Sequence, residues 1–161
     1  MAMSTWLQAV TLDEIADLRG RPDSINQLDK PHYYRTHFGP SLNYFVVGSA
    51  YPGESDGPLW PMLHGATFVD TPTLENGSFG LIPPARASEI AALLAEVDIA
   101  AVAARVADAD FDALIDEEEV DDLELITKDE APDLIADELA SLVAFYAETA
   151  RAGLGVVSYT T

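Results

Sequence analysis

One acidic segment, residues 108–138, sets the strongest limit on how this chain can fold. It holds fifteen carboxylates and a single cation, Lys128, in a chain with 28 acidic and 8 basic residues. So many like charges cannot be buried together, so the segment must contribute to the surface. Apolar residues are interleaved with the acids, which predicts a segment folded onto a core rather than a disordered tail. These residues are Val120, Leu123, Leu125 and Ile126.

The clustering of acidic residues also limits which classes of molecule this protein can bind. Most of the formal net charge of −20 comes from this segment, so the excess is local rather than spread over the surface. A strong negative field repels nucleic acid and anionic membranes and attracts cations or a basic protein surface. We therefore expect no direct nucleic-acid binding and favour a basic protein as partner.

Length and composition predict one domain over residues 1–161. The chain has no cysteine, which excludes a thiol nucleophile and a thiolate metal site. The N-terminal residues do not resemble a signal peptide, and no apolar run approaches the roughly 20 residues of a membrane-spanning helix. The expected location is the cytoplasm.

The two ends of the chain give the clearest structural signals. Residues 5–10 suit a strand, and Thr11 with Glu14 forms a capping box that predicts a helix over 11–19. Near the other end, apolar residues repeat at three and four positions in a helix that begins near Asp129. Gly153 then provides a left-handed stop before a strand over 156–160.

The middle of the chain is less regular. Residues 31–84 contain eight of the ten prolines and seven of the ten glycines, which predicts short elements joined by long loops. Residues 42–47 are apolar but too short for periodicity to separate helix from strand. Residues 85–107 are rich in alanine and predict helix with a break near Asp98, and one apolar face carries Ile90, Leu93, Leu94 and Val97. Terminal strands with several helices indicate an α+β domain with a small sheet that includes both terminal strands.

Several segments resemble the YfbM-like family of small bacterial domains of unknown function. The likeness includes three segments: the N-terminal strand that leads into the first helix, the tripeptide Leu28-Asp29-Lys30, and the turn and helix over 79–90. It is strongest over 144–159, where Ala144-Phe145-Tyr146-Ala147-Glu148-Thr149-Ala150-Arg151-Ala152-Gly153 runs into Val156-Val157-Ser158-Tyr159. The resemblance implies the fold and brings no known chemistry.

One pattern resembles a calcium-binding loop. Carboxylates at Asp108, Asp110, Asp112 and Glu119 match positions 1, 3, 5 and 12 of a twelve-residue loop. Ala113 stands at the sixth position, where such loops need glycine. The simpler interpretation is that Asp108 or Asp110 caps a short helix, and no metal or other cofactor is predicted.

The loop-rich region over 29–64 offers a second candidate site. It combines acid, cation, imidazole and aromatic side chains, which often gather around a ligand. The candidates are Asp29, Lys30, His32, Arg35, His37, Tyr51, Trp60 and His64. The alternative is that the histidines only hydrogen-bond loop backbone and the aromatic residues fill a core.

No recognised catalytic motif is present, so the sequence leans away from an enzyme. The leading hypothesis is a cytoplasmic interaction protein, of the kind that includes immunity proteins, whose acidic residues 108–138 bind a basic partner. The central residues of that surface are Asp116, Glu117, Glu118, Glu119, Asp121 and Asp122. A small-molecule-binding domain or enzyme that uses the 29–64 loops is the alternative, and an acidic mimic of DNA is a third hypothesis.

Overall fold

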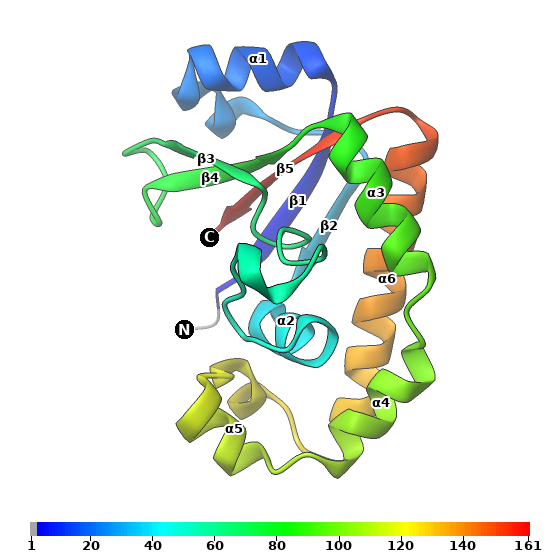
Figure 1. Cartoon of the computed structure of the whole chain (residues 1–161). Helices are drawn as coiled ribbons and strands as arrows, with labels where there is room; N and C mark the ends of the chain where they lie inside the picture. Colours follow the sequence, from blue (N-terminus) through cyan, green and yellow to red (C-terminus); the bar gives the residue numbers. More distant parts are fainter. Residues whose placement is uncertain (1–2) are drawn as a thin grey trace.

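A computed structural model describes residues 3–161 and contains one antiparallel sheet with the strand order β2-β1-β5-β4-β3. The strands predicted at both ends of the chain are present and lie side by side in the middle of this sheet (Figure 1). The strands are β1 (Thr5–Val10), β2 (Tyr33–Thr36), β3 (Thr67–Asp70), β4 (Ser78–Ile82) and β5 (Gly155–Thr160).

Helices account for most of the remaining chain and confirm the α+β class. The α-helices are α1 (Leu12–Gly20), α2 (Gly39–Val47), α3 (Pro84–Ala95), α4 (Ile99–Asp108), α5 (Phe111–Glu118) and α6 (Ala131–Arg151). Three short 3₁₀ helices are η1 (Pro22–Gln27), η2 (Glu54–Asp56) and η3 (Asp121–Leu125). Within residues 3–161, no helix combines the length and the apolar character needed to cross a membrane.

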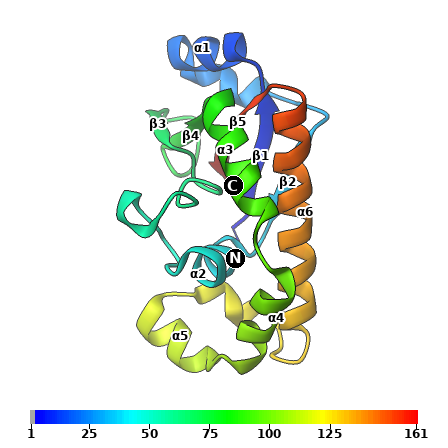
Figure 2. The same ribbon diagram turned by 45° about the vertical axis from the view of Figure 1, so that its right-hand side comes forward.

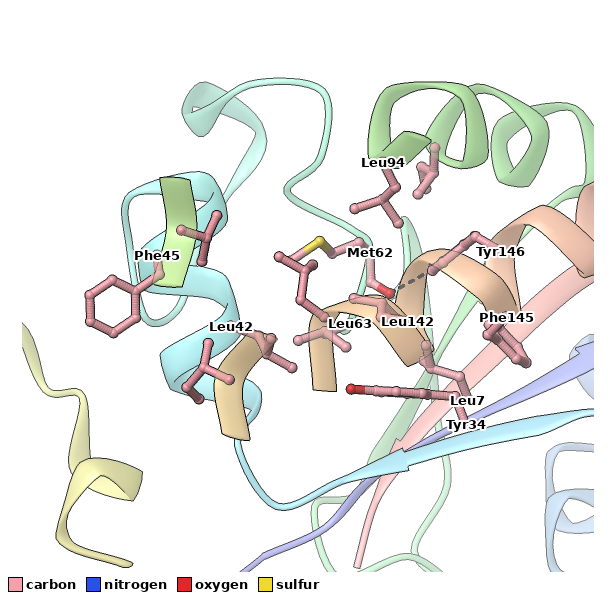
Figure 3. Close-up of a cluster of buried hydrophobic side chains, with 14 of the residues drawn as sticks. Leu7, Tyr34, Leu42, Phe45, Met62, Leu63, Leu94, Leu142, Phe145 and Tyr146 are labelled. Atoms are coloured by element: carbon pink, nitrogen blue, oxygen red, sulfur yellow. Dashed lines mark hydrogen bonds between the residues drawn. The ribbon is translucent and has the colours of Figure 1, made fainter. Parts of the chain in front are cut away.

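The larger core lies between one face of the sheet and helices α2, α3, α4 and α6. Residues of β1, β2, β4 and β5 point into it, among them Leu7 of β1 and Tyr34 of β2. The long helix α6 crosses this face and contributes Leu142, Phe145 and Tyr146, which Figure 3 shows packed together with the strand residues. Burial of this apolar surface is the main stabilising contribution to the fold.

A smaller core covers part of the opposite face. Val10, Phe79, Leu81 and Val157 of the sheet pack against α1 and η1 there. The predicted capping box holds the start of α1, since the Thr11 hydroxyl accepts from the Glu14 N–H and the Glu14 carboxylate accepts from the Thr11 N–H.

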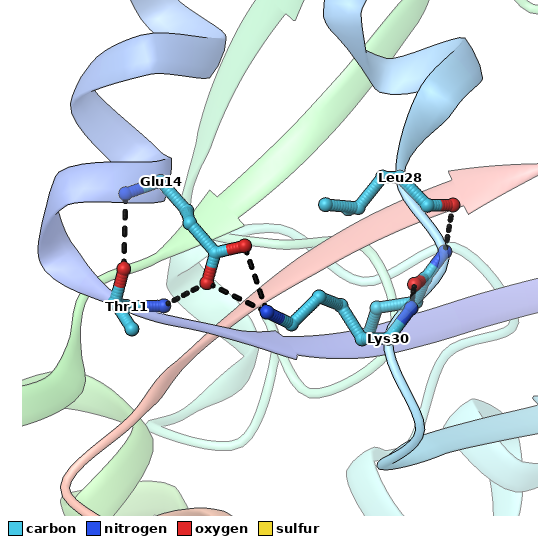
Figure 4. A network of polar contacts seen from close by, with 5 residues as sticks. Thr11, Glu14, Leu28 and Lys30 are labelled. Carbon is cyan, nitrogen blue, oxygen red and sulfur yellow. Dashed lines mark hydrogen bonds and ion pairs between the residues drawn. The ribbon is translucent and has the colours of Figure 1, made fainter.

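Lys30 joins the network at the start of α1 and ties the loop before β2 to it (Figure 4). Its ammonium group donates to both carboxylate oxygens of Glu14, at 2.8 and 3.0 Å. Its backbone N–H donates to the Gln8 side chain at 2.7 Å. Burial alone would raise the pKa of Glu14, but the hydrogen bonds from Lys30 and Thr11 outweigh it and lower this pKa.

The loop over 61–66 crosses the sheet inside the protein. The Tyr146 hydroxyl donates to the Met62 carbonyl at 2.6 Å, and the Ser158 hydroxyl donates to the Leu63 carbonyl at 2.5 Å. The loop backbone then lies directly on β4, where a Cβ on Gly80 would overlap the His64 carbonyl oxygen. Only glycine allows so close an approach of two backbone segments.

Some local predictions needed correction. Residues 42–47, which the sequence left undecided, belong to α2, which begins at the Gly39-Pro40 turn and ends at Gly48 with φ of 109°. Leu93 does not share the buried face of α3, because 37% of its surface is exposed. Helix α6 begins at Ala131, so Pro132 lies in the first turn, where its missing N–H costs nothing.

Candidate functional site

The acidic residues lie at the end of the molecule opposite α1 (Figures 1 and 2). They lie at the end of α4, on and around α5, on η3, in the turn before α6 and on the first turns of α6. Residues 3–161 contain four ion pairs, and none of them uses a carboxylate from 108–138. Among the described residues, no salt bridge therefore offsets the negative charge at this end.

Apolar contacts hold the segment in place, as predicted. Val120 and Leu123 are fully or almost fully buried in the larger core, and Ile126 packs against it. Leu125 points the other way, with 53% of its surface exposed among the acids. The backbone that carries these carboxylates is thus held on the domain.

Asp122 provides a polar anchor between the acidic segment and α2. Its carboxylate accepts from the Ser41 backbone N–H at 3.0 Å and from the Ser41 hydroxyl at 2.7 Å. Ser41 lies in the first turn of α2, where N–H groups have no partner within the helix and a negative charge is favourable. Only 7% of Asp122 is exposed, so it differs from the prediction and cannot contribute to a binding surface.

Burial raises the pKa of Asp122, and the hydrogen bonds from Ser41 only partly oppose this effect. The other five predicted residues, Asp116, Glu117, Glu118, Glu119 and Asp121, are all exposed. Tyr51 lies close to three of the acids in this region. Burial first, and then the charges of Asp121, Asp122 and Glu119, raise its pKa.

The calcium-loop pattern is not realised. Residues 111–118 form helix α5, and the Asp110 carboxylate caps it by accepting from the Ala113 N–H at 3.2 Å. Glu119 ends the helix with φ of 58°. The alternative interpretation, a carboxylate that caps a short helix, is therefore confirmed for Asp110. Over residues 3–161, no three metal-ligating side chains gather as a metal site requires.

A surface hollow lies beside the acidic residues, between the end of α2 and the α4–α5 turn. Its volume is about 550 Å³. It is lined by Tyr44, Phe45, Val46, Val47, Gly48, Arg105, Ala109, Asp110, Ala113 and Leu114. No local pattern predicts this hollow, because residues 44–48 and 105–114 meet only in the folded chain.

The eight candidates from the 29–64 loops are not gathered into one site. Lys30 binds Glu14 near α1, whereas His32 and His37 lie beyond opposite ends of β2. Tyr51 lies near the acidic segment. None of the eight, which also include Asp29, Arg35, Trp60 and His64, lines the hollow beside α2.

Each histidine has hydrogen-bonding partners in the protein. His32 stacks on Phe145 with ring centroids 4.6 Å apart and donates from Nε2 to the Phe145 carbonyl. Ser4 links Arg35 to His37, since its hydroxyl accepts from the guanidinium and is hydrogen-bonded to His37 Nδ1 at 3.0 Å. These contacts favour structural roles.

His64 is the most buried of the three histidines. Its Nε2 accepts from the Asn43 side-chain amide at 2.8 Å. Burial lowers the pKa of His64, which keeps the ring neutral and able to accept.

Comparison with known proteins assigns the chain to a family. The model of the family described as "Domain of unknown function (DUF1877)" matches residues 40–159. The chain belongs to the DUF1877 family. This DUF1877 domain is also similar in structure to YfbM from Escherichia coli, whose crystal structure is described as that of a protein of unknown function. The TM-score is 0.70 at 14% identity, with 98% of this chain and 99% of YfbM covered.

These matches confirm the family resemblance that the sequence indicated and the α+β fold that it predicted. At this level of identity the similarity to YfbM concerns the fold alone. No functionally curated protein matches this DUF1877 domain. Its chemistry must therefore be argued from its own surface.

Proposed function

We propose that this DUF1877 domain is a protein-binding module whose acidic end, residues 108–138, docks onto a basic surface of a partner protein. One observation carries the proposal, namely that fifteen carboxylates lie at one end of the molecule and none forms an ion pair within residues 3–161. A field of this kind accelerates encounter with a basic partner and discriminates against acidic ones.

The rigidity of the acidic end supports this proposal. Burial of Val120 and Leu123, together with the bond between Asp122 and Ser41, fixes η3 on the domain. Carboxylates carried on an ordered backbone can match a specific pattern of Lys and Arg residues, and little backbone entropy is lost on binding. A cytoplasmic location, as expected from the sequence, is part of the proposal.

The proposal is tested by capturing partners from the native lysate at low and at high salt. The test variant carries Asp116→Asn, Glu117→Gln, Glu118→Gln and Glu119→Gln. The matched control removes four exposed carboxylates elsewhere, with Glu54→Gln, Asp70→Asn, Glu75→Gln and Glu96→Gln. Attraction between exposed charges reaches ~10 Å at 0.1 M salt and ~3 Å at 1 M, so binding should weaken strongly at high salt.

The proposal is supported if a basic protein binds the wild type and the control at low salt. The same protein should not bind the test variant, and it should be lost from the wild type at high salt. Equal capture by the test variant and the control would contradict it. If the captured protein binds nucleic acid and a gel shift shows that DNA competes with the domain, the acidic end acts as a DNA mimic. The alternative of a ligand site in the 29–64 loops gains no support, since its residues are dispersed.

A further inference from the structure

The acidic end contains a continuous depression rather than a flat surface. The hollow between α2 and the α4–α5 turn, of about 550 Å³, borders a second hollow of about 430 Å³. The two share Ala109 and Asp110. The second is completed by Asp108, Phe111, Asp112 and Lys128.

The two parts of the depression differ in chemistry. The hollow beside α2 has a mixed lining of polar and apolar surface, and its apolar part includes the partly buried side chains Tyr44, Val47 and Leu114 next to the small Ala113. The second part carries three exposed carboxylates, from Asp108, Asp110 and Asp112. A partly apolar hollow beside carboxylates without an ion-pair partner among the described residues suits an apolar group that has positive charge next to it.

The two cations in the depression are already bound to the protein's own groups. Arg105 donates to the Phe45 carbonyl at 2.8 Å. Lys128 donates to the Ala109 carbonyl at 2.6 Å, and its ammonium group lies 5.6 Å from the centre of the Phe111 ring. Neither cation forms an ion pair with a carboxylate of the depression.

From this geometry we infer that the depression receives a large apolar side chain of the partner, carried on a segment with Lys or Arg residues on both sides. The inference rests on the proposed function and makes its occupant more specific. Charge complementarity selects the occupant, since Asp108, Asp110 and Asp112 would face its cations. Binding energy in protein interfaces concentrates where one large side chain fills a pocket surrounded by polar contacts.

The test uses two short amidated peptides and the full chain labelled with ¹⁵N. One peptide has a central tryptophan flanked by lysines, and the other has serine in place of the tryptophan. Backbone shifts followed during titration at low salt locate each peptide and give its affinity. We expect the tryptophan peptide to bind about tenfold more tightly, because the buried ring adds apolar contact. Its shifts should cluster at residues 44–48 and 109–114.

Two variants separate this inference from the proposed function. Ala113→Trp fills the hollow without changing charge, whereas Ala104→Trp places the same side chain on exposed α4 outside it. We expect only Ala113→Trp to abolish the advantage of the tryptophan peptide. Equal affinity of the two peptides in all three proteins would overturn the inference and leave the acidic end as a general docking surface. Failure of both peptides to bind at low salt would overturn the inference and the proposed function together.

Discussion

Replacing Asp122 by alanine tests the anchor that fixes the acidic segment. The substitution removes two hydrogen bonds, from the Ser41 N–H at 3.0 Å and from the Ser41 hydroxyl at 2.7 Å. Hydrogen bonds to charged groups contribute ~1.5–3 kcal/mol each, and loss of a helix cap costs ~0.5–2 kcal/mol. The raised pKa of Asp122 shows that burial of the charge outweighs these hydrogen bonds, so the loss in the alanine variant comes from the buried Ser41 donors that it leaves without a partner. We therefore expect Asp122→Ala to lower the free energy of unfolding by about 2 kcal/mol.

Urea unfolding and thermal unfolding measure this loss directly. For a chain of this length, 2 kcal/mol corresponds to a decrease in Tm of ~4–8 °C. Asp121→Ala is the matched control, because it removes the same charge from the neighbouring exposed position, where the described structure has no side-chain hydrogen bond. Its effect should stay within ~0.5 kcal/mol.

A double-mutant cycle with Ser41→Ala assigns the loss to the Ser41–Asp122 contact. Residues in direct contact typically show a coupling energy of ~0.5–3 kcal/mol, and we expect about 1 kcal/mol or more here. Amide hydrogen exchange should also accelerate over residues 111–125 in Asp122→Ala, because η3 loses its link to α2. Equal stability of Asp122→Ala and Asp121→Ala, or a coupling energy near zero, would refute the anchor.

Three further outcomes are expected. Gly80→Ala should destabilise the domain by ~2–3 kcal/mol in urea unfolding, because the added Cβ would overlap the His64 carbonyl. Gly20→Ala, at the exposed end of α1, is the control and should be neutral or stabilise the domain by up to ~1 kcal/mol. Tyr146→Phe should cost ~1–3 kcal/mol by the same measurement, since it leaves the Met62 carbonyl buried without its donor. Because the folded pKa of Asp122 is raised, the folded state holds that proton more tightly than the unfolded state. The free energy of unfolding should therefore rise as the pH falls from the folded-state pKa of Asp122 toward the ordinary aspartate pKa near 3.8. Urea unfolding midpoints measured across this pH range should rise less in Asp122→Asn than in the wild type.

Local signals predicted the elements that local forces determine. The capping box of Thr11 and Glu14 placed α1 within one residue, and β1 was predicted with its observed bounds. Asp98 marked the break between α3 and α4 because its side chain caps α4. In each case the decisive contact lies within a few residues along the chain.

The candidate site depends on contacts that no local pattern encodes. Ser41 and Asp122 are 81 residues apart, so nothing near Asp122 distinguishes it from Asp121, which is exposed. The same holds for the hollow between α2 and the α4–α5 turn. Conversely, the mixed chemistry of residues 29–64 suggested one site, but strand β2 separates His32 from His37 and directs their neighbours to different parts of the molecule.

The position of β5 has a consequence for how the sheet is assembled during translation. This strand is synthesised after the other four, yet it lies between β1 and β4 and pairs with both. Until it emerges from the ribosome, only the separate pairs β1–β2 and β3–β4 can form, and isolated strand pairs are marginally stable in water. The nascent domain therefore exposes two incomplete sheet edges until β5 has been synthesised, and insertion of this one strand completes the sheet.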